Sequence, residues 1–115
     1  MLNPLEKEIE KAVKRYAETK GWLTRKWSSP GHSFVPDQIF IAPWGKIIFV
    51  EFKRFGKKPE VPQEREHHKL RQNKAEVWVI DNIESGKEMI DHYEQLTNNP
   101  RSAPLSTESD QPPMY

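Results

Sequence analysis

Residues 36–53 read PDQIFIAPWGKIIFVEFK, two runs of strand-forming residues on either side of Pro-Trp-Gly. A three-residue connection with a left-handed glycine is a common hairpin turn. With Gly45 in that position, the register places Asp37 directly opposite Glu51. Residues 47–50 are apolar at every position, so we expect this strand to be buried on both faces near the centre of a sheet.

Two acids and an amine should therefore share one patch of the sheet. Carboxylates that face each other across strands repel, so a cation is expected between Asp37 and Glu51. Lys53 follows Glu51 by two residues and projects from the same face. Hydrolysis of a phosphodiester needs an activated water, which a divalent cation supplies by lowering the pKa of that water. The Phe52 carbonyl would add another of the oxygen ligands that Mg²⁺ prefers.

Composition limits the class of protein. A chain of 115 residues with 35% hydrophobic and 30% charged residues is expected to form one soluble domain with a thin core. No apolar run is long enough to cross a bilayer, so no membrane partner is expected. The first residues lack the form of a signal peptide, which favours an intracellular, cytoplasmic protein. The absence of cysteine excludes disulfides and thiolate zinc sites.

The charge is unevenly distributed although the net charge is only +1. Between residues 46 and 74 there are nine Lys and Arg against four acids, a local excess of five. Such an excess is a plausible footprint for a polyanion. The alternative is an ordinary solvated face. The loop that leaves Lys53 carries Arg54, Lys57 and Lys58, and Lys69 follows on the next helix.

Hydrophobic periodicity predicts the remaining elements. We expect helices at 5–19, 63–74 and 83–96, with strands at 22–27 and 76–80 beside the hairpin. The order is then α-β-β-β-α-β-α. A hairpin followed by a helical crossover indicates an α/β fold, a mixed sheet flanked by helices. We expect the folded domain to span residues 1–96 and the Asn-, Pro- and Ser-rich residues 97–115 to be a disordered tail.

Several single residues lead to separate expectations. His67 and His68 point about 100° apart on a helix and cannot easily share a metal, so both are expected at the surface. Leu70 should be the main apolar anchor of its helix, and Leu96 should face the core of the last helix. Trp44, at the hairpin tip, is expected to be exposed and free to contact DNA or a second copy.

The same residues resemble a known nuclease pattern. Pro36-Asp37 and Glu51-Phe52-Lys53 match the two halves of the PD-(D/E)XK signature. More of the chain resembles the virus-type replication-repair nuclease (VRR-NUC) family, roughly over residues 6–85. The further matching segments are Ser29-Pro30-Gly31, Trp44-Gly45, Gly56-Lys57-Lys58-Pro59 and Gln63. The resemblance is greatest to small stand-alone members carried by phages and prophages.

This resemblance implies a restriction-endonuclease-like core and metal-dependent hydrolysis with Mg²⁺ or Mn²⁺. Asp37 and Glu51 would be metal ligands, and Lys53 the catalytic lysine. Gln63 matches a family glutamine near the active site, where it would hydrogen-bond a water or a phosphate. The alternative for Glu51 is a structural ion pair with Lys53 or Arg25.

A glutamate on the first helix would complete the acidic cluster of the family. Glu10 matches the family position, whereas the helical wheel places Glu6 nearer the apolar stripe, so Glu10 is the first choice and Glu6 the second. Acids at the start of a helix also favour its dipole and pair with lysine four residues on, so either glutamate has an alternative, structural explanation.

The resemblance further implies DNA as the substrate and a phage or prophage origin. Small family members resemble Holliday-junction resolvases that cut two strands as homodimers. The alternatives are a nuclease acting on flaps, nicks or DNA ends, and a DNA-binding module that does not cleave. One departure from the family is the absence of a glycine before the strand at Val77. Asn73 is expected to adopt the left-handed conformation in its place.

Overall fold

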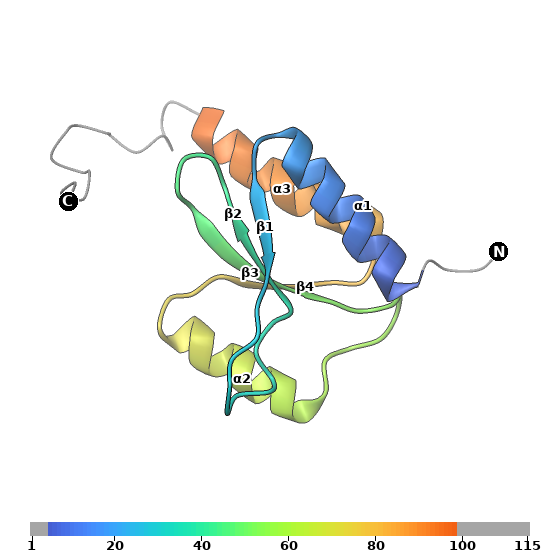
Figure 1. The fold of residues 1–115 in the computed structure, drawn as a ribbon, viewed down its shortest axis with the longest axis vertical. Coiled ribbons are helices and arrows are strands. Elements are labelled where there is room, and N and C mark those ends of the chain that lie inside the picture. The colour runs from blue at the N-terminus through green and yellow to red at the C-terminus, as the bar shows by residue number, and fades with distance from the viewer. Residues whose placement is uncertain (1–4, 99–115) are drawn as a thin grey trace, which may run out of the picture.

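The computed structural model describes residues 5–98 of the chain. The helices and strands follow the predicted order α-β-β-β-α-β-α (Figure 1). They are α1 (Glu6–Thr19), β1 (Leu23–Lys26), β2 (Gln38–Ile41), β3 (Ile47–Phe52), α2 (Val61–Gln72), β4 (Val77–Ile80) and α3 (Ile83–Asn98). α3 ends two residues later than predicted, and residues 99–115 of the expected tail lie outside the described part of the chain.

The four strands form the predicted mixed sheet, in the order β1-β2-β3-β4. β1 is antiparallel to β2 and β2 is antiparallel to β3, whereas β4 runs parallel to β3. The hairpin has the predicted turn, because the Ala42 N–H donates to the Lys46 carbonyl at 2.8 Å and Gly45 has a φ of +95°. Gln38 faces Val50 in the ladder, and continuing this register by one residue brings Asp37 opposite Glu51.

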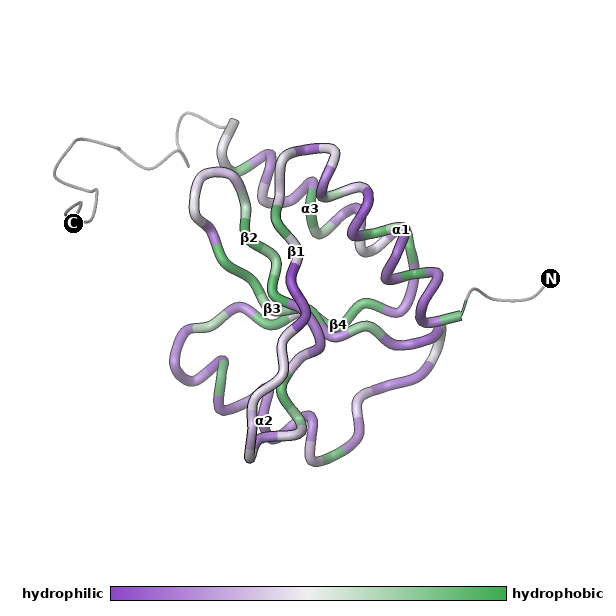
Figure 2. Tube along the Cα trace, viewed as in Figure 1, coloured by the Kyte–Doolittle hydropathy of each residue, from purple (hydrophilic) through white to green (hydrophobic). Residues whose placement is uncertain are grey.

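The hydrophobic core lies between one face of the sheet and the helices α1 and α3, which pack side by side (Figure 1). Ile9, Val13 and Ala17 recur at helical spacing and form the buried stripe of α1. Gly86 allows α3 to approach closely, because a Cβ there would lie 2.3 Å from the Val13 Cγ2. Figure 2 shows that apolar residues concentrate in β2 and β3, while α2 is largely hydrophilic.

The opposite face of the sheet is less covered than the apolar run at 47–50 predicts. Ile47 is 50% exposed and Phe49 is only partly buried, because α2 lies at one end of the sheet and leaves the hairpin end open (Figure 1). Leu96 is also wrongly predicted: it is 41% exposed near the end of α3. Trp44 is 39% exposed, as expected, and its ring meets that of Trp22 edge to face.

Helix α2 differs from its predicted form in four respects. It ends at Gln72, two residues earlier than predicted. It begins at Val61, two residues early, because Pro62 falls in the first turn, where its missing N–H costs no hydrogen bond. Lys74, with a φ of +69°, takes the left-handed conformation expected of Asn73. His67, expected at the surface, is the buried residue of the helix at 1% exposure, whereas Leu70 is only partly buried. His68 is exposed, as predicted.

Candidate active site

Asp37 and Glu51 meet where β2 begins and β3 ends. Asp37 lies one residue before β2, and its Oδ2 accepts a hydrogen bond of 3.2 Å from the backbone N–H of Phe52. This bond ties the carboxylate of one strand to the backbone of the other. The hairpin register, which was predictable from the turn, thus brings the two carboxylates together.

The surroundings of Asp37 and Glu51 disfavour the charged form of both carboxyl groups. Glu51 is 2% exposed, and burial together with the nearby charge of Asp37 raises its pKa to about 7. Burial also raises the pKa of Asp37, against the opposing effects of the Phe52 N–H, Lys53 and Lys26. The protein therefore holds one buried and one partly buried acid, and its own cations only partly offset their repulsion.

Lys53 joins the two carboxylates, as its two-residue spacing from Glu51 predicts. Its Nζ lies 3.4 Å from Glu51 Oε2, and the residue is 8% exposed. Arg25, the other predicted partner of Glu51, donates instead to the carbonyl of Thr24. The ion pair with Lys53 exists, but it leaves the pKa of Glu51 elevated and so does not neutralise the site.

Gln63 connects Glu51 to the start of α2. Its Nε2 donates to Glu51 Oε2 at 3.1 Å, while its Oε1 accepts from the Glu60 N–H at 3.0 Å. The second bond belongs to the cap of the helix and fixes which end of the amide faces Glu51. The turn into α2 therefore helps to position the Glu51 carboxylate.

The site has the donor set that a hard divalent cation requires. Glu51 Oε1 is buried and has no hydrogen-bond partner, an expensive arrangement unless a ligand occupies that position. Within residues 5–98, no three His, Cys, Asp or Glu side chains form a metal cage. Two carboxylates with the Phe52 carbonyl nevertheless suit Mg²⁺ or Mn²⁺, because such ions keep several waters when few protein ligands are available.

The two helix glutamates are placed differently. Glu10 is partly buried, and its Oε1 accepts a 2.6 Å hydrogen bond from Nε2 of Gln38, the neighbour of Asp37. Glu6 is exposed. Both line, with Asp37, one groove of about 640 Å³ beside the site. The contact with Gln38 favours Glu10, the residue that the family resemblance selects, over Glu6, which the helical wheel favours.

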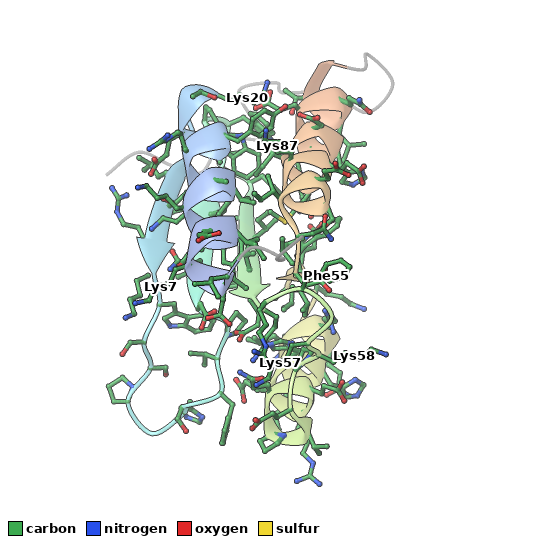
Figure 3. The ribbon with its side chains drawn as sticks, turned by 90° about the vertical axis from the view of Figure 1, so that its right-hand side faces the viewer. Lys7, Lys20, Phe55, Lys57, Lys58 and Lys87 are labelled. Atoms are coloured by element: carbon green, nitrogen blue, oxygen red, sulfur yellow. The ribbon has the colours of Figure 1, made fainter. Side chains whose placement is uncertain are left out.

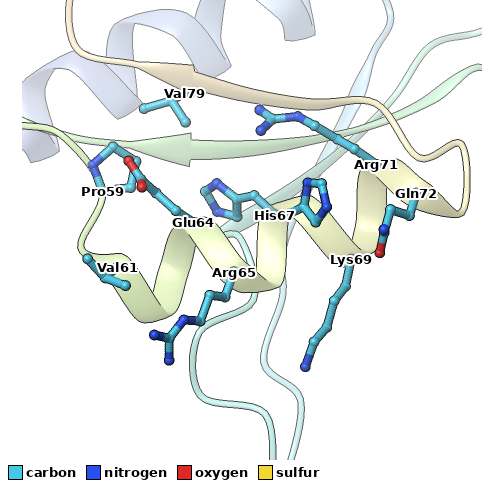
Figure 4. A pocket seen from close by; sticks show the side chains of 10 residues that line it. Pro59, Val61, Glu64, Arg65, His67, Lys69, Arg71, Gln72 and Val79 are labelled. Atoms are coloured by element: carbon cyan, nitrogen blue, oxygen red, sulfur yellow. The ribbon is translucent and has the colours of Figure 1, made fainter.

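The basic residues of the predicted binding surface are all exposed. Arg54, Lys57 and Lys58 lie in the loop after β3, and Lys69 lies on α2 (Figures 3 and 4). Lys69 extends away from β4, while Arg71 reaches toward the strand and donates to the Val77 carbonyl. Lys69 is therefore turned toward solvent and not toward the sheet.

The sequence alone did not single out two residues near the site. Gln38 is 3% exposed between Asp37 and Glu10, and its only signal is a polar side chain in an otherwise apolar strand. Asp81 Oδ2 accepts from the Gly56 N–H at 3.1 Å and holds the basic loop to the end of β4. Nothing in the sequence indicates that bond, since the two residues are joined only by the fold.

No family model matches the sequence. A protein named "Putative nuclease p44", from Acyrthosiphon pisum secondary endosymbiont phage 1, is 42% identical over 76 residues, which are 66% of this chain and 82% of that protein. A solved structure described as a VRR_NUC domain is similar at a TM-score of 0.71 and 38% identity, over 76% of this chain and 96% of that one. Fold and relatives agree with the predicted restriction-endonuclease-like core, and the chain belongs to the VRR-NUC nuclease family.

Proposed function

We propose that this protein is a hydrolase, a Mg²⁺- or Mn²⁺-dependent, structure-selective DNA endonuclease that cuts Holliday junctions as a homodimer. The observation that carries the proposal is the pair of the buried Glu51 and the partly buried Asp37 that lies opposite it, with one Glu51 oxygen left without a partner. A buried ion pair is favourable only when its remaining lone pairs are also hydrogen-bonded, and here Glu51 Oε1 is not.

In this proposal the side chains of Asp37 and Glu51 and the carbonyl of Phe52 hold the cation, with Glu10 completing the acidic cluster from α1. The bound ion supplies an activated water and charge stabilisation at the phosphate. Lys53 orients the attacking water or neutralises charge on the phosphate. Gln63 keeps the Glu51 carboxylate in its orientation through the 3.1 Å hydrogen bond.

The exposed basic residues support a polyanionic substrate. Arg54, Lys57 and Lys58 leave the strand directly after Lys53, where a phosphate backbone bound at the site has to pass. Contacts of this kind, with Lys69 farther along α2, position the DNA without reading its sequence and weaken as salt rises. They therefore fit recognition of DNA shape better than recognition of a base sequence.

The open face of the sheet supports a second copy. Leu23, Ile41 and Ile47 stand in one row across three strands, and the first and last are each 50% exposed. An exposed apolar row is typical of a protein–protein contact. Each chain carries one candidate site, so two cuts require two chains, which a symmetric dimer provides.

A cleavage assay tests the proposed activity. Synthetic four-way junctions, flaps, nicked DNA and linear duplex are incubated with Mg²⁺ or Mn²⁺ and with a chelator. We expect metal-dependent cutting of the junction and loss of cutting in Lys53→Ala and Asp37→Asn. The control is Lys20→Ala, which should cut normally. Lys20 is exposed and follows the C-terminal end of α1, whereas Lys7 marks the N-terminal end (Figure 3). Undiminished cleavage by the first two variants would refute the site.

The other outcomes separate the remaining alternatives. Junction binding without cutting would favour a binding module, and preferred cutting of flaps, nicks or ends would change the substrate. Sedimentation of Ile47→Lys tests the dimer. We expect a monomer that nicks junctions without resolving them, and a variant that still sediments as a dimer would exclude this face.

A further inference from the structure

The loop after β3 displays an aromatic ring at the tip of a tight turn. The Lys57 N–H donates to the Arg54 carbonyl at 3.0 Å, which closes a four-residue turn with Phe55 and Gly56 at its centre. Gly56 has a φ of +81°, the left-handed value that the second central position of a type II turn requires. Phe55 therefore occupies the first central position.

The turn is fixed at both sides of the ring. Before it, the Lys53 N–H donates to the Ile80 carbonyl at 2.9 Å. After the ring, the Gly56 N–H donates to Asp81 Oδ2 at 3.1 Å. Phe55 is thus presented from a short, anchored segment that begins two residues beyond Lys53.

Phe55 is 54% exposed, and its chain neighbours Arg54, Lys57 and Lys58 are exposed cations (Figure 3). Exposing an apolar ring to water is unfavourable, so covering the Phe55 ring with an apolar partner would lower the free energy. The chemistry of the loop suits a ligand that combines negative charge with flat apolar faces. A nucleic acid with accessible bases has both, whereas a paired duplex hides its base faces in the stack.

We propose that Phe55 is a stacking platform for an unpaired nucleobase next to the cleaved phosphate. The inference rests on the proposed nuclease function and specifies its substrate: DNA with unstacked bases at a branch point. Arg54, Lys57 and Lys58 bind the backbone of any DNA, and Phe55 adds affinity only where a base is free to leave the stack. Selectivity for branched DNA then arises within a single chain, in addition to any contribution from dimer geometry.

A binding comparison tests the platform. Fluorescence anisotropy in chelator, without cleavage, gives the affinity for a branched DNA with unpaired bases and for a matched duplex. We expect Phe55→Ala to lose roughly 5- to 100-fold in affinity for the branched DNA and little for the duplex. Phe55→Trp should retain the preference, and Phe55→Leu, which keeps apolar bulk without an aromatic face, should not.

Two readouts distinguish stacking from a general loss of binding. The dependence of affinity on salt should be unchanged in Phe55→Ala, because no charge is removed. A 2-aminopurine at the branch should be quenched by the wild type and by Phe55→Trp, but not by Phe55→Ala. Phe34→Ala is the matched control, because Phe34 is 43% exposed in the loop before Asp37.

An equal loss on branched DNA and duplex, full retention of the preference by Phe55→Leu, or an equal effect of Phe34→Ala would overturn the inference. The proposed function fails separately: a wild-type protein that neither binds nor cuts any DNA refutes both ideas. If the wild type cuts branched DNA and Phe55→Ala keeps the same preference, only the stacking platform is refuted.

Discussion

At the tip of the β2–β3 hairpin, Lys46 forms an ion pair with Glu76, whereas at the other end Glu51 faces a second carboxylate, Asp37. Glu76 also accepts a 2.6 Å hydrogen bond from the Tyr93 hydroxyl. Glu51 keeps one buried oxygen without a partner. The two glutamates therefore differ in their partners. Glu76, beside the start of β3, has a partner for each carboxylate oxygen, whereas Glu51, within β3, has one oxygen without a partner.

The pKa values of the two glutamates move in opposite directions. Burial acts to raise the pKa of Glu76, but the hydrogen bonds from Lys46 and Tyr93 outweigh it and hold that pKa below its ordinary value. Burial and Asp37 raise the pKa of Glu51 to about 7. The comparison indicates that the fold is able to neutralise a glutamate where only stability is at stake. At Glu51 the described residues leave one carboxylate oxygen unpaired, which is where we propose that a cation binds.

The largest effect is expected on cleavage. Glu51→Gln should lower the cleavage rate by at least about a hundredfold, because it removes a charge that the cation requires. Glu76→Gln should leave the rate unchanged, since Glu76 precedes β4 and pairs with Lys46 at the hairpin tip, at the opposite end from Glu51. Single-turnover cleavage of the same junction measures both variants, and equal losses in the two would erase the distinction between the hairpin ends.

A smaller effect, on cation binding, is expected from changes at Gln63, which donates a hydrogen bond to the Glu51 carboxylate. Gln63→Ala should weaken divalent cation binding roughly 10- to 100-fold, because Gln63 holds the Glu51 carboxylate in place. Gln63→Glu retains an acceptor for the Glu60 N–H and loses the donor to Glu51, so it should keep α2 folded while it removes the 3.1 Å hydrogen bond.

Calorimetry with circular dichroism as the folding control measures the Gln63 variants. Wild-type cation affinity in Gln63→Ala would show that Glu51 is positioned without help from α2. Loss of helix in either variant would assign Gln63 to the cap alone.

The smallest effect is on the pH dependence of the free energy of unfolding, and it has opposite signs for Glu51 and Glu76. A raised folded-state pKa means that neutral Glu51 stabilises the metal-free protein below pH 4.5, and that this contribution is lost as pH rises to about 7. The loss is at most about 3 kcal/mol. Glu76, with its lowered pKa, stabilises the protein above pH 4.5 and loses that contribution as pH falls further.

Urea unfolding in chelator at several pH values measures this dependence. We expect Glu51→Gln to flatten the curve between pH 4.5 and 7, and Glu76→Gln to flatten it only on the acid side. A wild-type stability that rises between pH 5 and 7 and is insensitive to Glu51→Gln would be inconsistent with a buried, strained carboxylate.

Local chemistry explains what the sequence predicts correctly. The Pro-Trp-Gly turn determines the hairpin register, and the register determines that Asp37 and Glu51 meet. The two-residue step then places Lys53 beside them. These relations depend on neighbours in the chain and on strand geometry, so they are readable before the fold is known.

Two of the incorrect predictions depend on where α2 packs. A histidine in a polar helix is predicted to lie at the surface, but α2 packs with His67 toward the sheet and buries it. An apolar strand reads as buried on both faces, but α2 covers only one end of the sheet and leaves Ile47 half exposed. The bond between Glu10 and Gln38 likewise depends on how α1 crosses the sheet, which no local pattern specifies.

The proposed cation site is tested by a Mn²⁺ titration of the metal-free protein at pH 8, followed by calorimetry, for the wild type, Glu51→Gln and Glu76→Gln. We expect saturable binding by the wild type and by Glu76→Gln, and no measurable binding by Glu51→Gln. Equal Mn²⁺ binding by all three proteins would contradict the claim that the unpaired carboxylate at the base of the hairpin is a cation site.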